Sequence, residues 1–140
     1  MKRNASAQWK GGLKDGKGTI TTPSNVLSQT PYNFSQRFED TPGTNPEELV
    51  AAAHAACFSM ALSGQLGNAG MTADSIETRA DLTMEKLDAG WTVTEIHLDV
   101  SCKIPGADKA KFEAAADNAK KGCPISRLLN TKITMSAALV

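Results

Sequence analysis

The segment ELVAAAHAACFSMALSG, residues 48–64, constrains the fold most, because it is small or apolar on every side. It follows Asn45-Pro46-Glu47-Glu48, which is typical of a helix start, with Asn at the N-cap and Pro at the first helical position. The pattern predicts a helix from Pro46 towards Gly64 or Gly67. A helix that lacks a polar face is typical of the protein core, so we expect other elements to cover it.

The rest of the chain alternates in the manner of strands or shows amphipathic helix patterns. We expect strands at residues 5–9, 18–22, 32–38, 76–86, 91–104 and 131–139, and helices at 108–121 and from 124 to about 129. In the third strand, Arg37 is predicted to face away from Tyr32, Phe34 and Phe38. Strands and helices are segregated along the chain, which predicts an α+β class with antiparallel sheet around a buried central helix, in a single domain over residues 1–140.

Composition excludes several classes of function. The 15 basic residues equal the 15 acidic ones, so the chain lacks the basic surface of a nucleic-acid-binding protein. The N-terminal MKRNASAQWK has no apolar stretch after its charges, unlike a signal peptide. The longest apolar run, Leu49 to Leu62, is shorter than a membrane span and contains His54. We therefore expect a soluble, cytoplasmic protein with no membrane or nucleic-acid partner.

Three cysteines without a C-x-x-C pair do not form a structural disulfide framework. Cys57 lies in the middle of the small-residue helix, where a thiol is either a core side chain or a reactive group. Cys123 precedes Pro124 at a helix start, where free N–H groups favour the thiolate. Cys102 follows the alternation of its strand and faces inward with Leu98 and Val100, so we predict a buried, inert thiol.

The remaining candidates have weaker patterns. His54 lies one helical turn before Cys57, which would suit a Cys–His pair or half of a metal site, but no third ligand follows, and packing or a hydrogen bond is the favoured interpretation. His97 is expected on a solvated strand face. Glu47 is one residue too early for a capping box, which leaves it free to pair with another group. The sequence predicts no metal and no cofactor.

Two segments of the sequence resemble motifs of a known protein family. RFEDTPGTNPEELVAAAHAACFSMALS resembles the signature of the OsmC and organic-hydroperoxide-resistance (Ohr) family, and KKGCPISRLL resembles its second cysteine motif. Arg37 lies ten residues before Glu47, which is similar to the placement of the arginine in the OsmC branch of the family. The resemblance implies an intertwined α+β homodimer that reduces organic hydroperoxides, and hydrogen peroxide more weakly. It also implies a role in protection against oxidative and osmotic stress.

By the same resemblance, Cys57 is similar to the reactive cysteine, Cys123 to the resolving cysteine, and Arg37 and Glu47 to an activating ion pair. Cys57 would form a sulfenic acid, and Cys123 would convert it to an intramolecular disulfide. An external dithiol, of the lipoyl type in the family, would reduce this disulfide. Two alternatives use the same cysteine pair: a thiol–disulfide oxidoreductase that acts on proteins, and a redox sensor that signals without turnover.

The spacing between Glu47 and Cys57 also bears on whether two chains form the site together. In a continuous helix, the ten residues from Glu47 to Cys57 rise about 15 Å, too far for an ion pair at one end to reach the sulfur easily. A second copy of the helix, packed antiparallel about a two-fold axis, would bring Arg37 and Glu47 of one chain to Cys57 of the other. We therefore expect a homodimer with composite sites.

Overall fold

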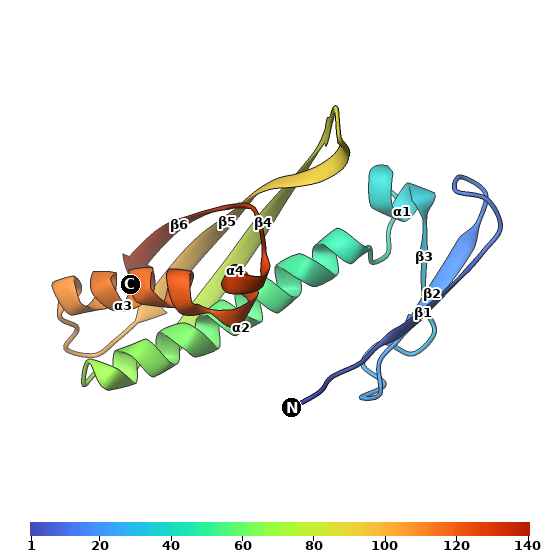
Figure 1. Cartoon of the computed structure of the whole chain (residues 1–140). Coiled ribbons are helices and arrows are strands. Elements are labelled where there is room, and N and C mark those ends of the chain that lie inside the picture. The colour runs from blue at the N-terminus through green and yellow to red at the C-terminus, as the bar shows by residue number, and fades with distance from the viewer. The chain divides into compact units, whose positions relative to one another are not determined.

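The structure, a computed structural model, describes all residues from Met1 to Val140. The chain divides into two compact units, Met1–Leu49 and Val50–Val140, and each is described by itself (Figure 1). Both units combine strands with helices that are segregated along the chain, so the predicted α+β class is confirmed. The single domain over residues 1–140 stays a prediction.

The first unit is a three-stranded antiparallel sheet followed by one turn of helix. Its strands are β1 (Ser6–Lys10), β2 (Lys17–Thr21) and β3 (Thr30–Asn33), in the order β1-β2-β3, and α1 spans Phe34–Phe38. Gly18 is buried in β2, and a Cβ there would collide with the ring of Tyr32. A larger residue would therefore displace the aromatic side chains on this face.

The second unit contains most of α2 and a second sheet. Its elements are α2 (Pro46–Asn68), β4 (Ser75–Leu87), β5 (Gly90–Lys103), α3 (Lys109–Gly122), α4 (Pro124–Leu128) and β6 (Lys132–Leu139). β4 and β5 are close to the strands expected at 76–86 and 91–104, and they pair antiparallel as a long hairpin. β6 pairs with β5 in parallel, so this sheet is mixed and not wholly antiparallel as expected. The reason is the connection: α3 and α4 return the chain across the sheet before β6 begins.

The core of the second unit lies between the sheet and its helices. Inward side chains of β5 pack with those of α2 and α3 in one core. Both helices run along the sheet (Figure 1). The buried set is Phe58, Leu62, Leu66, Ile96, Leu98, Val100, Cys102, Ile104, Phe112, Ala115, Ala116, Ala119 and Cys123. The predicted inward orientation of Leu98, Val100 and Cys102 in β5 is thus confirmed, and α3 buries one stripe of apolar side chains.

α2 is covered on one side only within a single chain. Its buried residues, His54, Phe58, Leu62 and Leu66, follow one another at intervals of four and form a narrow stripe. Met60, on another face, is 78% exposed. A single chain therefore leaves apolar faces of α2 uncovered, contrary to the expectation of a helix enclosed on all sides.

α2 is longer than the apolar run from Leu49 to Leu62 on which the expectation of no membrane span was based. The helix has 23 residues and a mean hydropathy of 1.4, which by length and composition alone suffice to cross a bilayer. The core helix of a soluble protein meets the same criterion. Within one chain 22% of this span is buried, and the buried stripe packs in the core of the second unit.

Candidate active site

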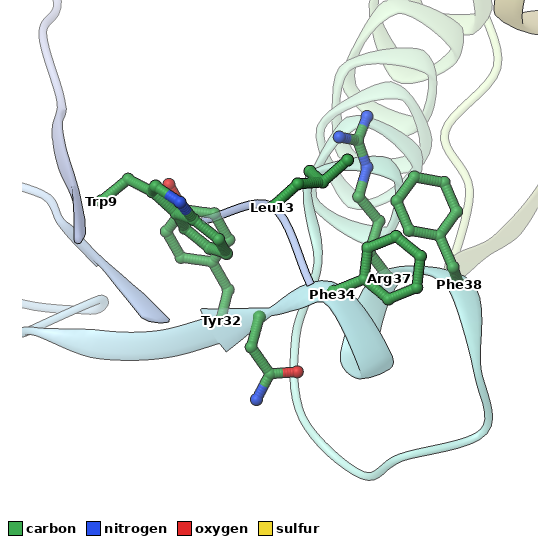
Figure 2. A pocket seen from close by; sticks show the side chains of 7 residues that line it. Trp9, Leu13, Tyr32, Phe34, Arg37 and Phe38 are labelled. Carbon is green, nitrogen blue, oxygen red and sulfur yellow. The ribbon is translucent and has the colours of Figure 1, made fainter. Parts of the chain in front are cut away.

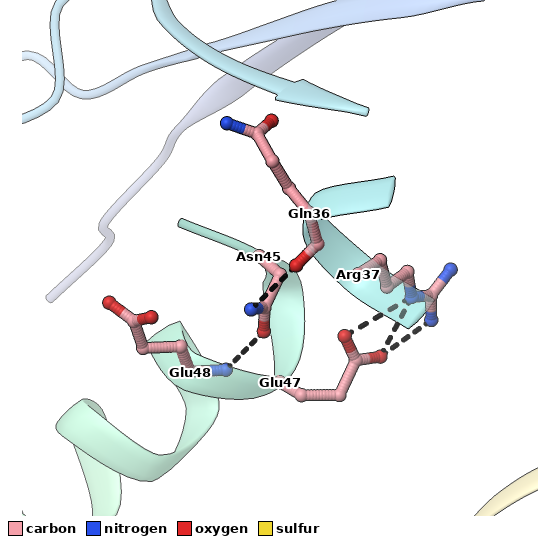
Figure 3. Close-up of polar contacts among 5 residues, drawn as sticks. All are labelled: Gln36, Arg37, Asn45, Glu47 and Glu48. Carbon is pink, nitrogen blue, oxygen red and sulfur yellow. Dashed lines mark hydrogen bonds and ion pairs between the residues drawn. The ribbon is translucent and has the colours of Figure 1, made fainter. Parts of the chain in front are cut away.

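Arg37 and Glu47 form a bidentate ion pair at the start of α2 (Figure 3). The Arg37 Nη2 lies 2.6 Å from Glu47 Oε1, and its Nε lies 2.9 Å and 3.1 Å from the two carboxylate oxygens. The Arg37 side chain is 38% exposed, whereas that of Glu47 is 16% exposed. The guanidinium is therefore fixed in orientation but still accessible, as a group that binds an anion must be.

The strand predicted over residues 32–38 ends early, at Asn33. The Asn33 Oδ1 accepts hydrogen bonds from the backbone N–H of Gln36 at 2.9 Å and from the hydroxyl of Ser35 at 2.8 Å, so Asn33 caps α1. The prediction that Arg37 faces away from the aromatic side chains is consequently wrong. Its Cζ lies 5.1 Å from the centroid of the Phe38 ring.

Asn45 connects α1 to the first turn of α2 (Figure 3). Its Oδ1 accepts the backbone N–H of Glu48 at 2.8 Å, which confirms the predicted N-cap, and its Nδ2 donates to the carbonyl of Gln36 at 3.1 Å. One side chain thus holds the two segments that carry Arg37 and Glu47. This explains why the ion pair forms across a ten-residue separation.

An aromatic pocket of about 280 Å³ adjoins Arg37 (Figure 2). Two ring pairs form much of its wall: Trp9–Tyr32, with centroids 5.4 Å apart, and Phe34–Phe38, with centroids 4.8 Å apart. The full lining is Trp9, Leu13, Tyr32, Asn33, Phe34, Arg37 and Phe38. The alternation of residues 32–38 does not indicate this pocket, because it places Phe34 and Phe38 in a strand; the Asn-Phe-Ser start of α1 was the signal that could have indicated it.

Cys57 and Cys123 are brought together in the second unit, and both are reduced. Cys57 on α2 is half-buried, whereas Cys123, between α3 and α4, is fully buried. Burial raises the pKa of the Cys57 thiol, the neighbouring Cys123 thiol raises it further, and a backbone hydrogen bond from Ile125 acts in the opposite direction. On balance, the contacts that Cys57 makes within one chain therefore favour its protonated thiol over the thiolate.

The helix start near Cys123 is where the sequence predicts free N–H groups beside this thiol. α4 has five residues, and the Cys123 side chain makes no capping hydrogen bond to it. The backbone hydrogen bond that favours a thiolate comes from Ile125 and is made to Cys57. The activation of Cys123 by free N–H groups stays a prediction.

The two histidines are both hydrogen-bonded. His54 is fully buried, and its Nε2 lies 2.7 Å from the Oγ of Ser126, so the favoured interpretation of packing with a hydrogen bond is confirmed. His97 is not simply solvated as expected. Its Nδ1 lies 2.6 Å from the hydroxyl of Thr134 and its Nε2 lies 3.2 Å from that of Ser136.

Cys102 provides a first testable prediction. It is fully buried on the inner face of β5, and burial raises the pKa of its thiol. We expect iodoacetamide to label Cys57 in the native protein and to spare Cys102, as measured by peptide mass spectrometry after a short exposure. Labelling in urea is the control, since all three thiols should then react. Equal labelling of Cys102 and Cys57 in the native protein would contradict the burial.

Comparisons with known proteins give a consistent result. The family model described as "OsmC-like protein" matches residues 38–137. The Peroxiredoxin OsmC of Escherichia coli (strain K12) is 50% identical over 137 residues, which cover 98% of this chain and 96% of that protein. The organic hydroperoxide resistance protein OhrB of Bacillus subtilis (strain 168) is 30% identical over 123 residues, with 87% and 88% covered. In fold, the chain is similar to the crystal structure of an OsmC-like protein from Mycoplasma pneumoniae, with a TM-score of 0.79, 17% identity, and 100% and 98% covered.

An α+β fold with two adjacent reduced cysteines, and relatives named peroxiredoxin and organic hydroperoxide resistance protein, define the class: a cysteine-based peroxidase. The chain belongs to the OsmC family, since the family model covers most of its length. Glu47, Cys57 and Cys123 fall inside the matched range, and Arg37 lies immediately before it. The catalytic roles of these four residues stay predictions.

Proposed function

We propose that this protein reduces organic hydroperoxides, and hydrogen peroxide more weakly, with Cys57 as the nucleophile and Cys123 as the resolving thiol. The observation that carries the proposal is the adjacency of the two reduced thiols, of which only Cys57 is partly accessible. A buried thiol beside an accessible one suits a resolving role, because peroxide reaches the accessible sulfur first.

The steps follow from the chemistry of thiols. The Cys57 thiolate attacks one oxygen of the O–O bond, forms an S–O bond and releases an alkoxide, which takes up a proton to become an alcohol. The product is a sulfenic acid at Cys57. The Cys123 thiol then attacks the Cys57 sulfur, so that an S–S bond forms and water leaves. The enzyme has at this point lost two electrons to the peroxide.

Cys57 needs a cation to become a thiolate. Burial and the Cys123 thiol both raise its pKa, and the hydrogen bond from Ile125 is the one contact that lowers it. Arg37 and Glu47 suit this task, because the accessible guanidinium can stabilise both the thiolate and the developing alkoxide. In the homodimer that we propose, Arg37 of one chain would serve Cys57 of the other.

The pocket beside Arg37 supports the organic class of substrate. Its walls are mainly aromatic rings, which favour an apolar group through contact area that hydrogen peroxide lacks. The relative OhrB is named for resistance to organic hydroperoxides, which agrees with this chemistry. An alkyl or aryl group would occupy the pocket while the peroxide oxygens face the guanidinium.

The regenerating reductant in this proposal is a dithiol of the lipoyl type. A dithiol opens the Cys57–Cys123 disulfide by thiol–disulfide exchange and leaves as a cyclic disulfide, which returns both cysteines to the thiol form. The reaction requires no metal or bound cofactor. We place it in the cytoplasm, where it would protect the cell during oxidative or osmotic stress.

Substrate preference tests the proposal. With dihydrolipoate as reductant, we expect multiple turnovers and a higher kcat/KM for cumene hydroperoxide than for hydrogen peroxide. Replacement of Trp9 by Ala should lower kcat/KM for cumene hydroperoxide by about tenfold, the typical effect of a lost apolar contact, and leave that for hydrogen peroxide unchanged. Trp91→Ala is the matched control, since Trp91 is 53% exposed and does not line the pocket.

The same assay separates the alternatives. Consumption of one equivalent of peroxide without further turnover would favour a redox sensor. Reduction of protein disulfides without peroxide consumption would favour a thiol–disulfide oxidoreductase. If Trp9→Ala lowered kcat/KM equally for cumene hydroperoxide and hydrogen peroxide, this would contradict the role of the pocket in binding the organic group.

A further inference from the structure

His54 makes a buried hydrogen bond whose purpose the proposed reaction does not explain. Its imidazole is 0% exposed, and its Nε2 lies 2.7 Å from Oγ of Ser126, a residue that is 8% exposed. The other ring nitrogen, Nδ1, is buried without a hydrogen-bond partner. Ser126 is therefore the single polar partner of this imidazole.

The bond resists separation of the two helices that it joins, α2 and α4. Burial lowers the pKa of His54, so the imidazole is neutral at pH 7, and the contact is a neutral hydrogen bond and not an ion pair. If α4 moved away from α2, a buried imidazole and a buried hydroxyl would both lose their partner, which is unfavourable in an apolar interior.

α4 needs such a contact because it is short. It has five residues, fewer than an isolated helix requires for stability. Cys123 precedes it directly, and Ile125, the neighbour of Ser126, is the source of the backbone hydrogen bond to Cys57. Apart from the contacts of the cysteines, His54–Ser126 is the one side-chain hydrogen bond between α4 and α2.

We propose that the His54–Ser126 hydrogen bond positions α4 so that Cys123 resolves the sulfenic acid of Cys57 before a second peroxide reaches it. Neither residue touches the peroxide; both act through Cys123, as positioning residues. The inference rests on the proposed function, in which Cys57 is the nucleophile and Cys123 resolves it.

Two reactions compete for the sulfenic acid. In the first, the Cys123 thiol attacks the Cys57 sulfur, an S–S bond forms, the S–O bond breaks and water leaves. In the second, another hydroperoxide transfers an oxygen to the Cys57 sulfur, which gives a sulfinic acid and an alcohol. A displaced Cys123 slows only the first reaction, so the over-oxidised fraction rises.

Variants that remove, shorten or retain one of the two polar side chains, His54 and Ser126, test this positioning role. In Ser126→Ala the hydroxyl is absent, and in His54→Asn the amide is too short to reach it. Ser126→Thr and His54→Gln keep a partner at the original position. The control is Leu66→Ala, which removes a buried side chain of the same α2 stripe twelve residues after His54. All variants are compared at a temperature where circular dichroism shows them folded.

Stopped-flow measurements with cumene hydroperoxide would follow sulfenic acid and disulfide formation separately. We expect Ser126→Ala and His54→Asn to slow disulfide formation by about 10- to 100-fold, the effect of a misplacement of about 1 Å, and to leave sulfenic acid formation within about twofold. The sulfinic acid at Cys57, measured by mass spectrometry, should rise in parallel. Ser126→Thr and His54→Gln should recover most of the rate.

Oxidation by diamide distinguishes a failure of this inference from a failure of the proposed function. Diamide accepts two electrons and two protons from a pair of thiols, so it reports how Cys57 and Cys123 meet without any peroxide. If diamide forms the disulfide more slowly in Ser126→Ala and His54→Asn than in the other variants, the positioning role is supported, even if the wild-type protein does not react with peroxides. An unchanged rate of disulfide formation in Ser126→Ala and His54→Asn, or an equal slowing in Leu66→Ala, would overturn it.

Discussion

Replacement of Cys57 by Ser is expected to reduce catalysed peroxide consumption to the background rate. A hydroxyl is a far weaker nucleophile than a thiolate, and Cys123 and Cys102 are both fully buried, so neither can substitute for Cys57. The measurement is the loss of cumene hydroperoxide in the presence of dihydrolipoate. The Cys102→Ser variant is the control and should keep its activity.

Cys123→Ser should behave differently, because the nucleophile remains. We expect one turnover, which ends in a sulfenic acid at Cys57 or, with more peroxide, in a sulfinic acid. A sulfenic-acid trap added during a single-turnover reaction, followed by peptide mass spectrometry, would show the product. Full activity of Cys57→Ser would reverse the two assignments, and steady turnover of Cys123→Ser would remove the need for a resolving cysteine.

Arg37→Ala is expected to lower kcat by about 100- to 1,000-fold, the usual effect of removing one donor that stabilises developing negative charge. The contacts of Cys57 within its own chain leave its pKa raised, and in the proposed reaction the guanidinium of Arg37 is the group that stabilises the thiolate. The rate of Cys57 alkylation should accordingly require a higher pH in Arg37→Ala than in the wild-type protein. Arg79→Ala is the matched control, since Arg79 pairs with Asp81 on an exposed strand face.

The proposed homodimer determines which Arg37 acts on which Cys57. α2 is continuous from Pro46 to Asn68, so Glu47 and Cys57 are separated by about 15 Å of helix rise. A single chain also leaves apolar surface of α2 uncovered, including Met60, which a second copy would bury. Both observations favour sites composed of two chains.

Mixed dimers test this arrangement. Arg37→Ala and Cys57→Ser are each expected to be inactive, but after refolding together each heterodimer would contain one site with both wild-type residues. Activity near half that of the wild-type dimer is the expected result. No recovery in verified heterodimers, or a fully active monomer by light scattering, would contradict a composite site.

The local patterns of the sequence predicted most of the elements. Asn45 and Pro46 marked the start of α2 correctly, because a cap and a proline act through adjacent backbone groups. The alternation from Ile96 to Ile104 placed Cys102 inside the core, since a strand that lies against helices buries every second residue.

The errors and omissions arose where distant contacts, or two competing local signals, decide the structure. β6 pairs in parallel with β5 because of the return path through α3 and α4, which no local pattern of β6 contains. Asn33 ends β3 and caps α1. Residues 32–38 carry both strand alternation and this helix cap, and the predicted strand followed the alternation. The partner of His54 lies 72 residues away, so sequence spacing could not indicate Ser126.

The central claim is that Cys57 and Cys123 form the redox pair, and peptide mapping after one equivalent of cumene hydroperoxide tests it most directly. The protein would be denatured in an alkylating agent to block free thiols, digested, and analysed without reduction by mass spectrometry. We predict one linked peptide pair that joins Cys57 to Cys123, with Cys102 alkylated. A disulfide that includes Cys102, or three alkylated cysteines with the peroxide unconsumed, would contradict the claim.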